Sequence, residues 1–211
     1  MTDATSSWAG FHATALARPP RELLRRTLGC FQVEGRPPGL TVDLGCGSGP
    51  DSLELLRRGW QVHAVDADGD GLQLLRQAVP PEVAKRLHLH AMPFHDFVFP
   101  PCDLVWASWS LPFCDPSRWH SLWQSATAAL RPGGRIAGDL FGTRHAFAEG
   151  GEVLVLDESA ARGLFAGLEL EAFDVEDGVR PSGGAIVRWH AFGFAARKPG
   201  PRNASAAGAR G

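Results

Sequence analysis

Several features that mark other classes of protein are missing from this sequence. The chain has no tyrosine, so a phenolic base is excluded. Its 21 Lys and Arg residues are balanced by 23 Asp and Glu, which excludes the strongly basic composition of a nucleic-acid binder. There is no apolar run of membrane-spanning length and no signal pattern at the first residues. We therefore expect a cytoplasmic protein that contacts neither membranes nor nucleic acid.

The cysteine and histidine patterns argue against a disulfide framework or a metal centre. The four cysteines form no C-x-x-C pair; they are Cys30, Cys46, Cys102 and Cys114. His88 and His90 alternate on one predicted strand, but no third ligand follows at a matched spacing. We interpret them as a partly solvated strand face and expect no metal. With 44% hydrophobic residues, the 211 residues are enough for one domain with one core.

A glycine-rich loop is the most informative stretch that is present. Residues 40–44 (LTVDL) lead into GCGSG at residues 45–49, and Pro50 opens a segment with leucines at helical spacing. This order predicts a strand, a tight loop and a helix. Glycines let the backbone turn sharply and approach a ligand without intervening Cβ atoms. The loop is therefore a candidate for close contact between backbone and ligand.

Acidic residues around the loop indicate which ligand suits it. A second predicted strand, residues 61–65, ends at Asp66, where a carboxylate can accept both hydroxyls of a ribose. A dinucleotide fingerprint requires G-x-G-x-x-G, whereas this loop reads G-x-G-x-G followed by Pro50. Asp43 and Asp51 would repel a diphosphate but suit a nucleoside with an ammonium and a sulfonium. S-adenosylmethionine is such a ligand.

Residues 41–68 resemble motif I and the following acidic motif of class I S-adenosylmethionine-dependent methyltransferases, and more narrowly the TehB-like, tellurite-resistance-type branch. The resemblance implies one α/β domain with a Rossmann-like, doubly wound sheet of seven strands, the last antiparallel, and an N-terminal helical lid. It also implies S-adenosylmethionine as the cofactor. The cofactor-binding residues expected on these grounds are Arg18, Asp43, Gly45, Cys46, Gly47, Gly49, Asp51, Asp66, Ala67, Asp96, Phe97, Ser108 and Trp109.

Two further stretches resemble family motifs that contact the adenine and the sulfonium. Asp96 and Phe97 match an acidic-aromatic pair that addresses the adenine; the alternative is that Asp96 caps a turn before the Pro-Pro pair at residues 100–101. The Ser-Leu-Pro-Phe run at residues 110–113 is similar to the motif that follows the fourth strand in the TehB-like group. There, Trp109 or Phe113 could stabilise positive charge through a cation–π contact.

The two ends of the chain are expected to differ from its middle. The resemblance implies that residues 1–20 form a lid, with Trp8, Phe11 and His12 near the substrate and Arg18 near the methionine carboxylate. Ordinary packing of these side chains is the alternative. Residues 21–198 are expected to form the methyltransferase domain. Residues 199–211 are rich in Gly, Ala and Arg without an apolar period, which predicts a disordered tail.

The remaining apolar patterns predict the rest of the sheet. Residues 116–130 have a helical period, the Pro-Gly-Gly at 132–134 predicts a turn, and residues 136–141 predict the fifth strand. Residues 168–175 and 186–196 read as the last two strands, joined by a loop over 176–184.

The chemistry expected from this cofactor is a direct displacement in which sulfur leaves as a neutral group, so the enzyme mainly has to position the reactants. A thiolate or a metalloid oxyanion would need no base. For an alcohol or amine, His12, His145 and His190 are the candidate catalytic bases, although His190 could equally be a hydrogen-bonded residue of the sheet. The acceptor is expected to be a small molecule, and the oligomeric state, monomer or homodimer, stays open.

Two other classes of function share parts of these motifs. An S-adenosylmethionine-binding module without turnover would have the same fold and cofactor pocket. An NAD-dependent oxidoreductase shares the strand, the glycine loop and the ribose-binding acid. It is disfavoured by Pro50, by Asp43 and by the lack of length for a second catalytic domain.

Overall fold

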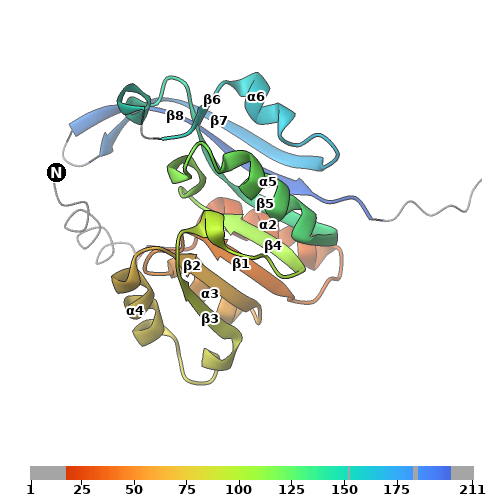
Figure 1. Cartoon of the computed structure of the whole chain (residues 1–211). Coiled ribbons are helices and arrows are strands. Elements are labelled where there is room, and N and C mark those ends of the chain that lie inside the picture. Colours follow the sequence, from red (N-terminus) through yellow and green to blue (C-terminus); the bar gives the residue numbers. More distant parts are fainter. Residues whose placement is uncertain (1–17, 152, 183–184, 201–211) are drawn as a thin grey trace, which may run out of the picture.

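The computed structural model describes residues 18–151, 153–182 and 185–200. They form one mixed sheet with helices on both faces (Figure 1). The main strands run in the order β3-β2-β1-β4-β5-β8-β7, and the short β6 pairs with β5. Their bounds are β1 Leu40–Leu44, β2 Gln61–Asp66, β3 Leu87–Ala91, β4 Cys102–Ala107, β5 Leu130–Gly142, β6 Val155–Leu156, β7 Glu169–Ser182 and β8 Ala185–Arg197.

Only one strand of this sheet runs against the others. Strands β1 to β6 pair in parallel, whereas β8 is antiparallel to both of its neighbours, β5 and β7. The predicted doubly wound α/β fold with a single antiparallel strand is therefore confirmed. The two-residue β6 adds one strand to the seven that were expected.

Helices cover both faces of the sheet and divide the core into two layers. Helices α2, α3 and α4 pack on one face around Leu24, Leu56 and Leu75, while α5 and α6 pack on the other around Trp123 and Ala161. Figure 1 shows α5 in front of β4 and β5 and α2 behind them. The helix bounds are α2 Glu22–Val33, α3 Pro50–Arg57, α4 Gly69–Ala78, α5 Trp119–Ala129 and α6 Glu158–Gly163. Short 3-10 turns lie at η1 Ala84–Arg86, η2 Phe94–Asp96, η3 Leu111–Phe113 and η4 Ala146–Gly150.

Two sequence-based predictions near the C-terminal half were wrong in their boundaries. The segment 131–134 lies within β5 instead of forming a separate turn, with an irregular register opposite β4. The predicted loop over 176–184 was also too long, because β7 continues to Ser182 and pairs with β8 along its whole length. Ion pairs from Arg144 and Arg188 to Asp177 hold the outer part of this hairpin.

The order of the strands fixes where a ligand can bind. Strand β1 is flanked by β2 on one side and β4 on the other, so the order of the sheet reverses between β1 and β4. In open α/β sheets, the carboxyl ends of the strands at such a switch point form a binding crevice. In the described part of the chain, no helix is long and apolar enough to cross a membrane.

Candidate functional site

The glycine loop leaves β1 at the switch point and requires glycine for its conformation. Gly45, Gly47 and Gly49 all have positive φ, of 65°, 55° and 76°. The Gly45 N–H donates to the carbonyl oxygen of Val65 at the end of β2, at 2.8 Å. A Cβ at Gly45 would overlap the side chain of Ser110, which follows β4. The loop is therefore held between the ends of β2 and β4, at a distance that leaves no room for a side chain at Gly45.

Asp66 joins the end of β2 to this loop. Its Oδ2 accepts the Gly47 N–H at 2.7 Å, and its Oδ1 accepts the Asp68 N–H at 2.8 Å. Each oxygen of a carboxylate can accept two hydrogen bonds, so both retain one free position. Ala67, the next residue, is exposed. The carboxylate is thus pre-oriented beside the loop, with capacity for two more donors.

Two carboxylates lie buried beneath the loop, as its flanking acids predicted. Asp43 accepts the Ser52 hydroxyl at 2.6 Å and is only 3% exposed. Burial raises the pKa of Asp43 to about 7, and the neighbouring charges of Asp51 and Asp66 act in the same direction. The ionised form of an acid with such a pKa is stabilised by any positive charge placed beside it.

Asp51 is the anchor of a hydrogen-bond network at the start of α3. Arg18 binds its two oxygens in a bidentate pair, with distances of 3.0 and 2.8 Å, and the Trp106 indole N–H donates to it at 3.2 Å. The sequence predicted Arg18 near the methionine carboxylate, and the structure places it on this acid. The predicted lid residues Trp8, Phe11 and His12 lie outside the described residues, as does most of the predicted tail.

The loop after β4 is held in an uncommon backbone conformation. Trp109 has φ of 54°, the only positive value among described residues other than glycine. Its N–H donates at 3.1 Å to Asp139 on β5, and the Arg21 guanidinium lies 5.5 Å from the centre of its ring. Burial raises the pKa of Asp139 to about 6, although Arg21 and the Trp109 N–H favour its charged form. Ser108, at the start of this loop, is half-buried.

An aromatic cluster surrounds Phe141 at the same edge of the sheet. Phe141 stacks on His145 with ring centroids 3.7 Å apart, and Trp189 lies 4.7 Å from His145 and 5.0 Å from Trp109. Phe113 lies 5.9 Å from Phe141 and is 42% exposed. We use the name aromatic cluster for Trp109, Phe113, Phe141, His145, Phe147 and Trp189. Asp139, Phe141 and Trp189 were not predicted as site residues; the acid inside the apolar run at residues 136–141 was the available signal for Asp139.

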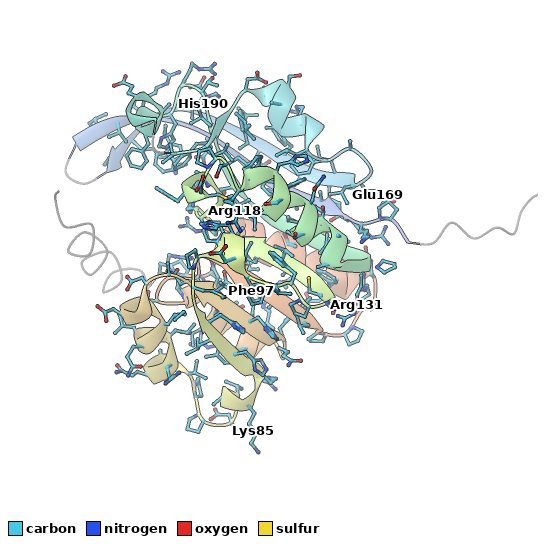
Figure 2. The ribbon with its side chains drawn as sticks, in the orientation of Figure 1. Lys85, Phe97, Arg118, Arg131, Glu169 and His190 are labelled. Carbon is cyan, nitrogen blue, oxygen red and sulfur yellow. The ribbon has the colours of Figure 1, made fainter. Side chains whose placement is uncertain are left out.

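The two described candidate bases occupy buried positions with different partners. His145 Nδ1 accepts the Phe147 N–H at 3.1 Å, and burial lowers its pKa. His190, on β8 in Figure 2, is 3% exposed and accepts the Arg144 N–H at Nδ1, while its Nε2 lies 3.2 Å from the Arg144 guanidinium. Burial and the charge of Arg144 lower the pKa of His190. His190 therefore fixes the loop after β5.

The predicted adenine pair lies at the opposite side of the switch point, after β3. Asp96 is exposed and accepts a hydrogen bond from Arg118 at 2.8 Å. Phe97 is 8% exposed and packs edge-on against His90, with centroids 4.9 Å apart. Figure 2 labels Phe97 and Arg118 near the middle of the molecule. Within the described residues, no group of three His, Cys, Asp or Glu side chains is placed to hold a metal.

Solved structures that superpose on this chain include several methyltransferases. Residues 41–134 match the methyltransferase domain family. TehB from Haemophilus influenzae superposes with a TM-score of 0.66 at 16% identity over 82% of this chain, which spans 61% of TehB. The 1,6-didemethyltoxoflavin-N1-methyltransferase from Burkholderia thailandensis, solved with its substrate and S-adenosylhomocysteine, gives 0.65 at 21% identity, over 92% of this chain and 85% of its own.

A third solved structure has the same fold. The N-methyltransferase NodS from Bradyrhizobium japonicum WM9, in complex with S-adenosylhomocysteine, superposes with a TM-score of 0.64 at 17% identity, over 88% of this chain and 91% of its own. No curated protein sequence matches this chain significantly. At these identities the solved structures establish the fold alone, and the family match covers residues 41–134. Residues 41–134 therefore match a methyltransferase domain, and the described residues have the fold of the solved S-adenosylmethionine-dependent methyltransferases.

Proposed function

We propose that this protein transfers a methyl group from S-adenosylmethionine to a small-molecule acceptor by direct displacement, mainly by positioning the two reactants. The observation that carries the proposal is the meeting of three features at one edge of the sheet. Asp66 is oriented by the glycine loop, Ser110 of the loop after β4 packs against Gly45, and Trp109 of that loop contacts the aromatic cluster. A nucleoside site and an apolar site thus adjoin.

The residues present fit this cofactor. The free acceptor positions of Asp66 suit two ribose hydroxyls, and the bare backbone of residues 45–49 allows close approach of the ligand. Asp43 is buried with its pKa raised to about 7, so a ligand with an ammonium and a sulfonium would favour its ionised form; Asp51 lies buried at the same loop, paired with Arg18. When bound, S-adenosylmethionine supplies an electrophilic methyl group.

The chain's own residues would orient the ligands and exclude water more than they would move protons. Asp139 fixes the Trp109 loop, and the aromatic cluster lines the side from which an acceptor would approach. His190 meets donors from Arg144 at both ring nitrogens, an arrangement that leaves it poorly placed to take a proton. Asp96 and Phe97 remain the residues proposed to face the adenine, and Arg18 the one proposed to face the methionine carboxylate.

An acceptor screen tests this proposal. The purified protein and S-adenosylmethionine would be mixed with thiols, metalloid oxyanions, alcohols, amines and flat heteroaromatic compounds. Release of S-adenosylhomocysteine would be followed against a blank without acceptor. We expect release that depends on at least one acceptor class and is inhibited by added S-adenosylhomocysteine. Tight binding of S-adenosylhomocysteine with no release above the blank for any class would favour a binding module without turnover.

A further inference from the structure

The aromatic cluster contains a buried histidine whose second ring nitrogen has no partner. His145 Nδ1 accepts the Phe147 N–H, so in the neutral ring the proton resides on Nε2. Burial lowers the pKa of His145, which favours this neutral form. The side chain is 1% exposed, and Nε2 has no hydrogen-bond partner among the described residues. His145 therefore presents an unsatisfied N–H donor and has no free lone pair with which to act as a base.

A second unsatisfied donor belongs to a ring that packs against His145. The indole N–H of Trp189 is buried and has no acceptor within the described part of the chain, and its ring centre lies 4.7 Å from that of His145. A buried donor without an acceptor loses its hydrogen bond to water and gains none in return, so two in adjoining rings need an explanation. The Ser110 hydroxyl, 6% exposed beside the glycine loop, is also unpaired. The unpaired groups thus extend from the hairpin strand β8 to the loop against which the cofactor is proposed to bind.

The walls around these donors are flat and apolar. Phe141 stacks on the face of His145 at an angle of 17°, and Trp109 and Trp189 meet edge to face. Phe113 and Phe147, at 42% and 43% exposed, are the outer members of the cluster, and a ligand would displace them to reach the donors. A pocket of about 390 Å³ adjoins His145 on its outer side; Arg144, Glu149 and Arg188 also line it, whereas the other rings of the cluster do not. This volume is within the range of small-molecule sites.

These features discriminate between classes of acceptor. A cationic amine is disfavoured because the unpaired ring groups are donors. A small metalloid oxyanion is disfavoured because it needs several charged donors to replace its water. The cluster offers neutral donors between aromatic faces, and the adjoining Arg144 and Arg188 are already paired with Asp177. A planar conjugated molecule satisfies both features, since its faces match the rings and an oxygen in its plane can accept from the two N–H groups.

We propose that the methyl acceptor is a planar conjugated molecule with a carbonyl or phenolic oxygen, oriented by hydrogen bonds from His145 Nε2 and Trp189 Nε1. His145 then acts as a substrate-binding donor and not as a general base. This inference rests on the proposed function, whose site it completes on the acceptor side.

A pair of probes that differ by one oxygen tests the inference. 1-Naphthol and naphthalene would each be titrated calorimetrically into the full chain saturated with S-adenosylhomocysteine. We expect 1-naphthol to bind at least tenfold more tightly, because naphthalene has no in-plane acceptor and leaves both donors unpaired. In His145→Phe, which keeps a ring against Phe141 but removes the donor, this preference should fall at least tenfold. His145→Gln, which retains a side-chain N–H, should recover part of it.

Controls separate this inference from the function on which it rests. His88→Phe replaces a half-buried histidine on β3 and should leave the preference unchanged. Trp189→Phe provides a second test should His145→Phe fail to fold. Failure of the wild-type protein to bind S-adenosylhomocysteine would overturn the proposed function itself. Normal binding of S-adenosylhomocysteine with equal affinity for the two probes, or an undiminished preference in both variants, would overturn the acceptor assignment alone.

Discussion

Replacing Asp43 by Asn is expected to stabilise the folded protein above pH 7 while weakening its binding of S-adenosylmethionine. The pKa of Asp43 is raised by burial from 3.8 to about 7. Between these values the folded state keeps a proton that the unfolded state releases, so stability falls as the pH rises toward 7 and then levels off. A shift of this size corresponds to about 4 kcal/mol, which the neutral Asn avoids. Ser52 can still donate to its amide oxygen.

The measurement is the free energy of unfolding in urea at intervals from pH 4 to pH 8. The difference between Asp43→Asn and wild type should grow with pH and become constant above pH 7. Asp70→Asn, an exposed acid at the start of α4, controls for the loss of one negative charge. If Asp43→Asn were less stable than wild type at pH 8, the contacts of the ionised Asp43 carboxylate would have to outweigh the cost of burying it.

Replacing Asp66 by Ala is expected to weaken binding of S-adenosylhomocysteine by about 10- to 150-fold. The variant loses the acceptor proposed for two ribose hydroxyls, and such hydrogen bonds to a charged group contribute about 1.5–3 kcal/mol in total. It also leaves the N–H groups of Gly47 and Asp68 without their acceptor, which loosens the glycine loop. Calorimetric titration gives the dissociation constant, and circular dichroism shows whether the variant is folded.

Graded variants make the result specific to the carboxylate. Asp66→Asn keeps one oxygen that can accept and should fall between Ala and wild type. Asp70→Ala, four residues further along the chain, should bind normally. An unchanged affinity in a folded Asp66→Ala protein would mean that the ribose binds elsewhere.

The parts of the site that were predicted from the sequence are those encoded by short-range patterns. The GCGSG loop, the strand before it and the acid at the end of the next strand lie within 27 residues, because one β-loop-α-β unit contains them all. The structure places Asp66 against Gly47, as that unit requires. The individual strands and helices followed from their apolar periods, whereas the doubly wound sheet was implied by the resemblance to class I methyltransferases.

The parts that were missed depend on contacts between distant segments. The Trp109 N–H meets Asp139 across 30 residues, and nothing near Trp109 in the sequence signals its positive φ. Arg18 meets Asp51 across 33 residues. The hairpin was predicted too short because its Asp-Gly and Gly-Gly pairs are typical turn signals, whereas pairing with β8 and the ion pairs of Asp177 favour continued strands.

Titration of the protein with S-adenosylhomocysteine, and separately with NAD, tests the central claim most directly. The glycine loop lacks the dinucleotide pattern, and Asp43 and Asp51 lie buried where a diphosphate would have to approach. We predict saturable binding of S-adenosylhomocysteine by calorimetry and no measurable heat with NAD. Micromolar binding of NAD, with no response to S-adenosylhomocysteine, would contradict the account.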